Sequence, residues 1–394
     1  MNLVYSVAVV SGALDALVAI AVLLRGRERI GAGRMLLAAA ASSAFFVAKA
    51  VLLLKLIPGA SLFAVILLAF AYVAGSLPLT GLAVLFVARQ RPVSGLVRAA
   101  AVVALLGAPA AVWGSLIEPF RLQIEQVEVP LAAERAGHEP IRVGVIADLQ
   151  ARQVSEFERK AVWRLMAQHP DLILIPGDLA QVWPRSTEES VAEFRALLAE
   201  LDAPLGVWMV LGNCDSVDVV ERALEGTRVR LLSDERVEIP FKDRRIVLCG
   251  IGMEYRSAAA NAAARELEAL AGQDDVRILL AHYPDAYRLL PSPARTDLVI
   301  AGHTHGGQVQ VPWFGPPITL SGVPRAVAAG GLHELDGRRI YVSRGLGVER
   351  GWAPRVRFNC PPEITLLQLG DAAKPAEDRS AGLHAREDVP QVRN

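Results

Sequence analysis

Four long apolar stretches lie in the first 118 of the chain's 394 residues, at 3–24, 35–57, 62–88 and 96–117. Each has the ~20 residues that an α-helix needs to cross the hydrocarbon core of a bilayer. A cleaved signal peptide would have one shorter apolar core, and the helices of a soluble bundle would each carry a polar face, which none of these stretches shows. The sequence therefore predicts four membrane-spanning helices over residues 1–118.

Arginine placement predicts how these helices are oriented. The loop between the first two stretches carries Arg25, Arg27, Arg29 and Arg34, and the loop between the last two carries Arg89, Arg91 and Arg98. The connection at 58–60 and the N-terminus hold no Lys or Arg. By the positive-inside rule both arginine-rich loops are cytoplasmic. Because the number of spans is even, we expect both ends of the chain, and the whole C-terminal part, on the outer side.

Two ionisable residues fall deep within the predicted spans, Asp15 and Lys49. Either charge would be costly if it faced lipid. At 1.5 Å per residue the two lie at depths of roughly 20 and 12 Å, a gap that a lysine side chain can close. We therefore expect them to pair. Gly75, Pro78 and Gly81 predict a kink in the third helix.

The rest of the chain alternates between strand-like and helix-like segments. Short apolar runs at 141–147, 172–176, 207–211, 276–281 and 298–301 have the composition of strands buried on both faces. Helix-like stretches at 154–168, 190–201 and 258–271 lie among them. This alternation predicts an open α/β sheet, and such sheets bind ligands beyond the carboxyl ends of their strands.

Each of these five strands ends in side chains that can ligate a metal or take part in catalysis. They are Asp148 and Gln150, then Asp178, then Asn213, Cys214 and Asp215, then His282, and finally His303 and His305. Residues two apart on an extended backbone share a face, so His303 and His305 can point into one pocket. A single strand-end Asp or His is often only a turn former. Five such ends that converge favour a metal site.

The residue types at these strand ends restrict the chemistry. Carboxylates, imidazoles and an amide oxygen form a mixed oxygen and nitrogen set that suits Mn, Fe or Zn, and one carboxylate can bridge two ions. Two ions about 3.5–4 Å apart can clamp an attacking hydroxide and phosphoryl oxygens during in-line displacement. The sequence contains no serine nucleophile elbow, P-loop or dinucleotide-binding fingerprint that would compete for this site.

These strings resemble the calcineurin-like metallophosphoesterases over roughly 141–369. The resemblance is carried by Asp-Leu-Gln at 148–150, Gly-Asp at 177–178, Gly-Asn-Cys-Asp at 212–215, His-Tyr-Pro-Asp at 282–285 and Gly-His-Thr-His-Gly-Gly-Gln at 302–308. Together with Ser-Arg-Gly-Leu-Gly at 343–347, the last two strings are similar to the membrane-anchored bacterial branch. Members of that branch are commonly described as phosphodiesterases or UDP-2,3-diacylglucosamine pyrophosphatase-like enzymes. The resemblance implies an α/β sandwich and a multi-pass protein of the bacterial inner membrane.

The resemblance also implies a ligand set for two divalent ions. One ion would be held by Asp148, Asp178 and His305, and the other by Asp178, Asn213, His282 and His303. Asp178 would then bridge the two ions. The chain departs from the family pattern at Gln150 and Cys214, where the family usually has histidine. We expect Gln150 to act as a weaker metal ligand, and Cys214 and Asp215 to be catalytic.

Two interpretations of these departures stay open. The protein is an active hydrolase of a phosphomonoester, phosphodiester or pyrophosphate, with a small-molecule or lipid-linked substrate, or it is a sensor or scaffold that binds metal or phosphate without turnover. The net charge of +0, without a basic patch, gives no indication of nucleic-acid binding.

We expect the chain to have four parts: membrane helices at 1–118, a linker and leading strand at 119–140, a phosphoesterase domain at 141–369 and a disordered polar tail at 370–394. The sequence does not specify an oligomeric state.

Overall fold

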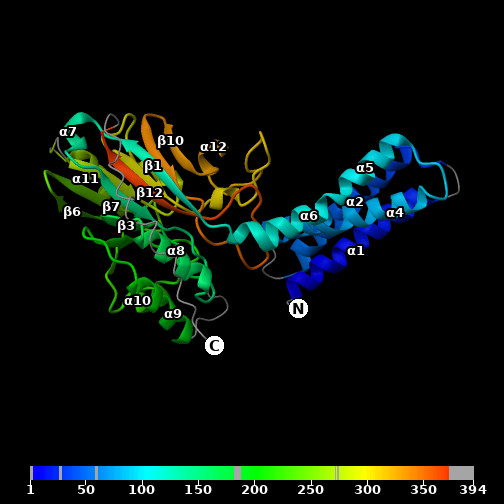
Figure 1. Ribbon diagram of the computed structural model, residues 1–394, viewed down its shortest axis with the longest axis horizontal. Helices are drawn as coiled ribbons and strands as arrows, with labels where there is room; N and C mark the ends of the chain where they lie inside the picture. Colours follow the sequence, from blue (N-terminus) through cyan, green and yellow to red (C-terminus); the bar gives the residue numbers. More distant parts are fainter. Residues whose placement is uncertain are drawn as a thin grey trace, which may run out of the picture.

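The computed structural model describes residues 3–25, 29–57, 61–181, 188–270, 272 and 275–371. Four long apolar helical segments form an elongated bundle on one side, and a mixed α/β domain lies on the other (Figure 1). Arg27, the connection at 58–60 and residues 372–394 of the predicted tail lie outside the described residues.

The four predicted spans are present as helices of sufficient length and apolar character to cross a membrane. The first two are α1 (Leu3–Leu24) and α2 (Ala32–Leu56). The third comprises α3 (Leu62–Ala71), a π-helical turn η1 (Tyr72–Ser76) and α4 (Leu77–Val87). The fourth comprises α5 (Gly95–Leu105), α6 (Gly107–Val112), a π-helical turn η2 (Trp113–Ile117) and a 3-10 turn η3 (Glu118–Phe120).

The third helical segment, in which a kink is predicted, contains the π-helical turn η1, and such turns are found at helix kinks. Pro78 is the second residue after this turn and has no backbone N–H to donate to the preceding turn. The wider π-helical turn therefore absorbs the change in hydrogen bonding without ending the helix. The predicted pair is also present, because Nζ of Lys49 lies 2.6 Å from Oδ2 of the fully buried Asp15.

The strands form two six-stranded sheets, with strand orders β1-β12-β2-β3-β4-β5 and β10-β11-β9-β8-β7-β6. The first sheet contains β1 (Gln123–Pro130), β12 (Glu363–Gly370), β2 (Ile141–Val145), β3 (Leu172–Ile175), β4 (Val207–Met209) and β5 (Val229–Leu231). The second contains β10 (Gly331–Leu335), β11 (Arg338–Val342), β9 (Leu298–Ala301), β8 (Asp275–Leu280), β7 (Arg244–Gly250) and β6 (Glu235–Phe241). Strands β2 to β5 run parallel, as do β7, β8, β9 and β11.

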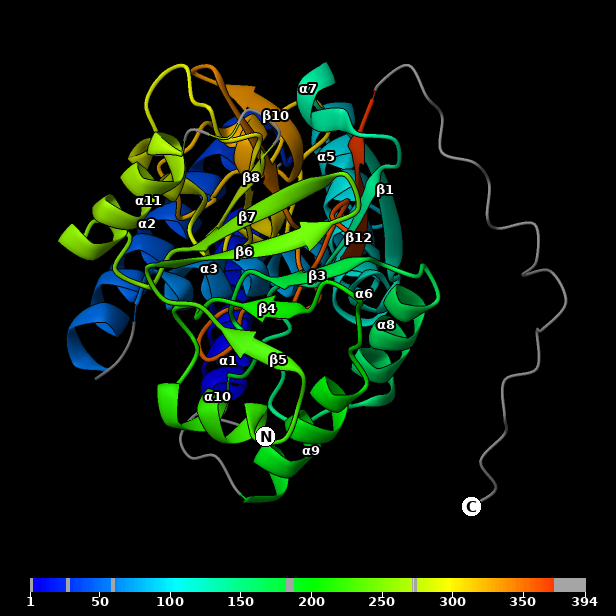
Figure 2. The same cartoon turned by 90° about the vertical axis from the view of Figure 1, so that its left-hand side faces the viewer.

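The two sheets pack face to face, and helices cover both outer faces (Figure 2). Val143 and Leu174 of the first sheet share one buried cluster with Ile246 and Ile278 of the second. The outer face of the first sheet packs against α8 (Glu156–Met166), α9 (Glu188–Ala199) and α10 (Val217–Leu224). The outer face of the second packs against α11 (Ala258–Ala269). The predicted α/β sandwich behind four apolar helices is confirmed.

The expectation of a single open sheet was wrong. Strands β2, β3 and β4 belong to the first sheet, whereas β8 and β9 belong to the second. In chain order, the antiparallel pair of β6 and β7 lies between β4 and β8, and the second sheet begins with this pair. An apolar run shows that a strand is buried on both faces, but it does not show which strand lies beside it. The remaining short elements are α7 (Ala133–Ala136), α12 (Arg325–Ala328) and the 3-10 turns η4 (Pro284–Leu289) and η5 (His305–Gly307).

Specific hydrogen bonds join the fourth apolar segment to the α/β domain. The carbonyl of Gly114 accepts a bond from the backbone N–H of Arg357 at 2.8 Å. Glu118, only 3% exposed, accepts from the N–H of Cys360 at 2.6 Å and from the indole N–H of Trp113 at 2.6 Å. A buried carboxylate bonded at both oxygens fixes the end of the helix against the domain. Strand β1 then begins three residues after η3 ends.

Candidate metal centre

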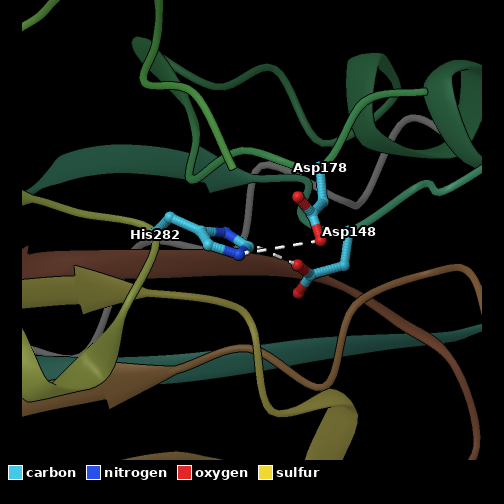
Figure 3. Close-up of side chains that lie close together, drawn as sticks. All are labelled: Asp148, Asp178 and His282. Carbon is cyan, nitrogen blue, oxygen red and sulfur yellow. Dashed lines mark ion pairs between the residues drawn. The ribbon is translucent and has the colours of Figure 1, made fainter. Parts of the chain in front are cut away.

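Three of the predicted ligands converge where β2, β3 and β8 end. Figure 3 shows Asp148 and Asp178 facing the imidazole of His282. Nδ1 of His282 lies 3.8 Å from Oδ1 of Asp148, and Nε2 lies 3.6 Å from Oδ2 of Asp178. All three side chains are buried, and one potential ligand atom from each lies within 4.8 Å of the others. The two sheets therefore bring their carboxyl ends to one site.

Asn213 joins this group through its side-chain oxygen. Oδ1 of Asn213 lies 2.8 Å from Nε2 of His282 and 2.9 Å from Nδ1 of His303. Ligand atoms that share one ion at bond lengths of ~2.0–2.2 Å are separated by roughly 3 Å, so this spacing suits a common ion. Nδ1 of His282 donates to the carbonyl of Pro176 at 2.8 Å. That bond directs the lone pair of Nε2 toward Asn213 and Asp178, as in many metal-binding histidines.

His305 and Gln150 supply the clearest test of whether a cation fits. His305 is 2% exposed, and both its ring nitrogens lack a hydrogen-bond partner among the described residues, as does Oε1 of Gln150. Buried polar atoms without partners cost free energy, so proteins rarely keep them without a reason. Burial lowers the pKa of His303 to about 4 and that of His305 to about 3, so both imidazoles are neutral at pH 7. Neutral imidazole is the form that binds metal.

The backbone at these positions is strained. Asp148, Gln150, Asp178, His303 and His305 all have positive φ, between 41° and 71°. Residues other than glycine rarely adopt this conformation, which costs on the order of 1–3 kcal/mol at each position. Such strain persists only where the surrounding structure fixes it, and it is concentrated at functional sites. Five strained residues within one group of potential ligands therefore support a metal-binding role.

Asp178 lies at the centre of the site. Its Oδ1 accepts from the backbone N–H of Cys214 at 2.8 Å, and its Oδ2 accepts from Nε2 of Gln150 at 2.8 Å. Burial acts to raise the pKa of Asp178, but the neighbouring His282 and these hydrogen bonds outweigh it and lower the pKa. Burial, together with the charge of Asp178, raises the pKa of Asp148 well above its ordinary value. Two buried carboxylates this close favour a bound cation.

The two departures from the family pattern contact each other. Nε2 of Gln150 donates to Sγ of Cys214 at 3.3 Å as well as to Asp178. Burial and the charge of Asp178 raise the pKa of the Cys214 thiol far above its ordinary value. The amide and the thiol therefore form one hydrogen-bonded pair next to Asp178, at the positions where the family usually has two imidazoles.

Asp215 is placed to organise the loops of the site. Its carboxylate accepts hydrogen bonds from the backbone N–H groups of Asp178, Leu179, Ala180 and Gly212, at 2.8–3.2 Å. These bonds connect the loop after β3 with the loop after β4. These hydrogen bonds indicate that Asp215 positions the two loops. The catalytic role that we expect from the sequence stays a prediction.

The loop after β11 approaches the site more closely than the sequence indicated. The N–H groups of Leu346 and Gly347 donate to the carbonyls of Ala147 and Asp148 at 3.0 and 2.7 Å. Gly345 has a φ of 65°, and a Cβ atom there would lie 2.7 Å from Cβ of Asp148, so only glycine fits. The two glycines of the Ser-Arg-Gly-Leu-Gly string were the sequence signal for this contact, because glycine allows two backbones to approach closely.

Two charged residues that follow this string were missed as part of the site. Nε of Arg350 donates to the carbonyl of Gln150. Burial raises the pKa of Glu349, the charge of Asp178 raises it further, and a hydrogen bond with Gln150 acts in the opposite direction. The N–H of Glu349 also donates to Oε1 of Gln308 at 2.8 Å. The only sequence signal for these two residues was their position two and three residues after the last glycine of the string.

Comparisons with known proteins identify the family. A sequence profile of the Calcineurin-like phosphoesterase family matches residues 141–307. Phosphodiesterase YaeI of Escherichia coli (strain K12) is 31% identical over 208 residues, which cover 51% of this chain and 71% of that protein. The chain belongs to the calcineurin-like phosphoesterase family. It is therefore a phosphoesterase, a hydrolase, and its buried Asp148, Asp178 and His282 are consistent with the metal site of a metallophosphoesterase.

Two further relatives of this phosphoesterase share a more specific description. UDP-2,3-diacylglucosamine pyrophosphatase LpxG of Chlamydia muridarum (strain MoPn / Nigg) is 26% identical over 315 residues, which cover 65% of this chain and 92% of that protein. The protein of the same description from Chlamydia trachomatis serovar D (strain ATCC VR-885 / DSM 19411 / UW-3/Cx) is 27% identical over 333 residues, covering 68% of this chain and 96% of that protein.

Proposed function

We propose that this phosphoesterase uses two divalent ions, of Mn, Fe or Zn, to hydrolyse a lipid-linked phosphomonoester, phosphodiester or pyrophosphate at a membrane surface. The observation that carries the proposal is the convergence of Asn213, His282 and His303. Nε2 of His282 and Nδ1 of His303 lie 2.8 and 2.9 Å from Oδ1 of Asn213, and Nε2 of His282 lies 3.6 Å from Oδ2 of Asp178. Such a group is arranged for a cation rather than for a network of ordinary hydrogen bonds.

The donor set divides between two ion sites with Asp178 as the bridge. One site comprises Asp148, Gln150 and His305 with Asp178, and its support is the set of unpartnered buried atoms on Gln150 and His305. The other comprises Asn213, His282 and His303 with Asp178. When bound, two such ions would activate the water nucleophile and neutralise charge that develops on the phosphoryl group.

The protein's own residues hold this arrangement in place. Asp215 gathers the amides of the loops after β3 and β4, and so fixes the orientation of Asp178. Pro176 orients the ring of His282 through its carbonyl. The thiol of Cys214 lies next to Asp178 and can donate only a weak hydrogen bond to a phosphoryl or leaving-group oxygen. We therefore expect slower turnover than a histidine at that position would give.

The membrane helices restrict the choice of substrate. A domain that begins immediately after a membrane helix stays within reach of the bilayer, which favours a lipid-linked phosphate over a freely diffusing one. The arginine pattern supports an outward-facing domain in the inner membrane. UDP-2,3-diacylglucosamine, named in the LpxG relatives, is made on the cytoplasmic side and fits that orientation less well. We favour a lipid-linked phosphate or pyrophosphate exposed at the outer surface.

The unit that carries the activity begins before residue 141. Strand β1 pairs with β12 along all eight residues from Gln123 to Pro130. Removing it would expose the edge of β12 in the first sheet. We therefore place the start of the catalytic unit at Gln123, within the segment expected to be a linker and leading strand.

The test uses the full-length protein in lipid nanodiscs with Mn²⁺ and bis(4-nitrophenyl) phosphate as a generic phosphodiester. Release of 4-nitrophenol should be lost in Asp178→Asn. The matched control is Asp218→Asn, because the Asp218 side chain is 74% exposed and lies outside the site. Release of 4-nitrophenol that persists in Asp178→Asn at the wild-type rate would exclude this site as its source.

Gln150 and Cys214 favour a second candidate, a degenerate site that binds metal or phosphate and signals through the membrane helices. The same preparation separates the two functions when Mn²⁺ binding is followed by calorimetry. Metal binding that depends on Asp178 without any turnover of phosphoesters would support the sensor. Metal binding together with turnover supports the hydrolase.

A further inference from the structure

A cavity of about 750 Å³ lies between the membrane helices and the phosphoesterase domain. Its walls are formed by α1, α3, η1, α4 and the end of the fourth helical segment on one side, and by α8 and the loop at 346–355 on the other. The volume lies within the ~300–1,000 Å³ typical of sites for small molecules. Figure 1 shows the region where the bundle meets the domain, with α6 leading into β1.

The membrane side of this cavity is lined by small and apolar residues. Gly12 and Ala13 of α1 form part of the wall, and Ala74 of η1 and Phe70 of α3 form another part. Gly12 is nine residues from the start of α1, which corresponds to roughly 14 Å along the helix axis. The cavity thus extends into the depth occupied by lipid chains, where water-soluble ligands are scarce.

The domain side of the cavity carries charged residues beside apolar ones, with Glu158 next to Phe157 on α8 and two arginines near Leu346 and Val348. Arg350 and Arg355 contribute to its wall there. Arg350 also donates from Nε to the carbonyl of Gln150, a potential metal ligand. One short loop therefore lines the cavity and contacts the metal centre, and its two guanidinium groups provide positive charge that complements phosphate.

The same loop is fixed at both ends. Trp352 packs against the buried cluster that Leu53 of α2 forms with Ala64 and Leu68 of α3 in the membrane segment. The guanidinium of Arg357, fully buried, donates to the carbonyls of Gly345 and Gly347 at 2.6–3.1 Å. A loop held by a membrane contact on one side and a buried arginine on the other keeps the cavity and the metal centre in a fixed relation.

We propose that this cavity binds an acyl chain of the substrate and so presents the attached phosphate to the metal centre. The inference rests on the proposed phosphoesterase function and adds the site that selects lipid. The occupant is a hydrocarbon chain because the deep part of the cavity is apolar and lies within the bilayer. The arginines at the shallow end suit the phosphate that such a chain carries.

A pair of probes separates chain recognition from phosphoester chemistry. Methyl 4-nitrophenyl phosphate and hexadecyl 4-nitrophenyl phosphate release the same product by the same bond cleavage and differ only in chain length. The full-length protein with Mn²⁺ in detergent micelles should hydrolyse the hexadecyl ester with the higher kcat/KM. The ratio of the two kcat/KM values measures chain recognition.

Filling the cavity should reduce this ratio. Ala13→Phe places a ring where α1 lines the cavity, and Ala74→Phe does so independently from η1. We expect each to lower the ratio by about tenfold, or ~1.4 kcal/mol. The matched control is Ala40→Phe, because Ala40 is exposed on α2 and lies outside the cavity wall. The control should keep the wild-type ratio, and size-exclusion chromatography would show that each variant is folded.

A second measurement does not depend on turnover. Hexadecyl phosphate with a diazirine near the end of its chain is photolysed with the full-length protein in nanodiscs, and the labelled peptides are identified by mass spectrometry. We expect adducts to concentrate on α1, α3 and the loop at 346–355, and to decrease in Ala13→Phe. Adducts spread evenly over lipid-facing residues such as Ala40 would identify ordinary surrounding lipid and overturn the proposal.

The outcomes distinguish this inference from the proposed function. If wild-type protein hydrolyses neither ester, the phosphoesterase proposal fails for these substrates, and the cross-linking pattern still decides whether the cavity holds a chain. If it hydrolyses both esters and neither Ala13→Phe nor Ala74→Phe changes the ratio, the phosphoesterase proposal stands and the acyl-chain site is excluded.

Discussion

Lys49 of α2 forms an ion pair with Asp15 of α1, with Nζ 2.6 Å from Oδ2. Lys49 also donates to the hydroxyl of Ser11 at 2.7 Å and to its carbonyl at 3.1 Å. The carboxylate of Asp15 is fully buried, so the lysine is its compensating charge within an apolar bundle. This pair fixes the relative position of the two helices, and one of them lines the proposed acyl-chain cavity.

Removing one member of this pair should destabilise the protein more than removing both. Asp15→Leu and Lys49→Leu each leave an unpaired charge in a low-dielectric environment, and we expect each to cost about 3–5 kcal/mol. The double variant should recover a large part of that loss. Folded yield and thermal unfolding of the full-length protein in one detergent measure the effect. Additive losses in the double variant would show that the two side chains are not coupled.

The orientation of the domain can be tested with a reporter that is active only outside the cytoplasm. A fusion after Gln123 should be active, and a fusion after Arg29 should be inactive, because the arginine-rich loops are expected on the cytoplasmic side. Both fusions are compared at equal expression. The opposite pattern would reverse the assignment and make a cytoplasmic nucleotide-linked lipid the better substrate candidate.

Gln150→His should strengthen binding at the first ion site. Imidazole is a better ligand for Mn or Zn than an amide oxygen, and we expect a gain of about tenfold, or ~1.4 kcal/mol, in metal affinity measured by calorimetry. Because Gln150 donates to Cys214 and Asp178, the variant must also reorganise those contacts. Unchanged metal affinity would argue against residue 150 as a ligand.

Cys214→His should raise turnover by on the order of 10²-fold if a stronger hydrogen-bond donor assists the leaving group. Cys214→Ser is the matched control, since it keeps a small side chain without an imidazole. A different result is expected if the thiol is a soft zinc ligand: Cys214→His would then lower activity, and Cys214→Ser would lower zinc affinity. Because residues 150 and 214 are in contact, their effects should not add in the double variant.

Asp215→Asn should destabilise the protein even without metal. The carboxylate accepts four backbone N–H groups, and the new amide would turn one hydrogen-bond acceptor into a donor that faces them. We expect a loss of about 3 kcal/mol in the free energy of unfolding, measured by denaturation in the presence of a chelator. A variant that is inactive but has wild-type stability under those conditions would favour a catalytic role over a positioning role.

Gly345→Ala should weaken metal binding, because the new methyl group would press against Asp148. Gly351→Ala is the matched control. Gly351 has a similar φ of 69°, but nothing lies within 4 Å of the position of its Cβ. Both variants place alanine at a positive φ, which costs ~1–2 kcal/mol in the free energy of folding. Only Gly345→Ala should also lower the affinity for Mn²⁺. Equal metal affinities in the two variants would show that the close approach of this loop does not shape the site.

The sequence by itself determined the parts of this protein whose signals are local. A run of apolar residues of sufficient length specifies a membrane helix regardless of its neighbours, and all four predicted runs are helical. A polar residue directly after a buried strand is equally local, so Asp148, Asp178 and His282 could be selected before their contacts were known. The charge of Asp15 also required a partner, because an unpaired carboxylate is costly in an apolar helix.

Only the tertiary structure decided how these parts combine. Strand pairing depends on residues far apart in the chain, so the division of β2 and β8 between two sheets could not be predicted from alternating segments. The sequence predicts a catalytic role for Asp215, and only the structure shows that its carboxylate accepts hydrogen bonds from the amides of two loops. Glu349 and Arg350 reach the site because a glycine-containing loop folds back against Asp148. In each case long-range packing brings the contacting atoms together, and that packing leaves no local pattern in the sequence.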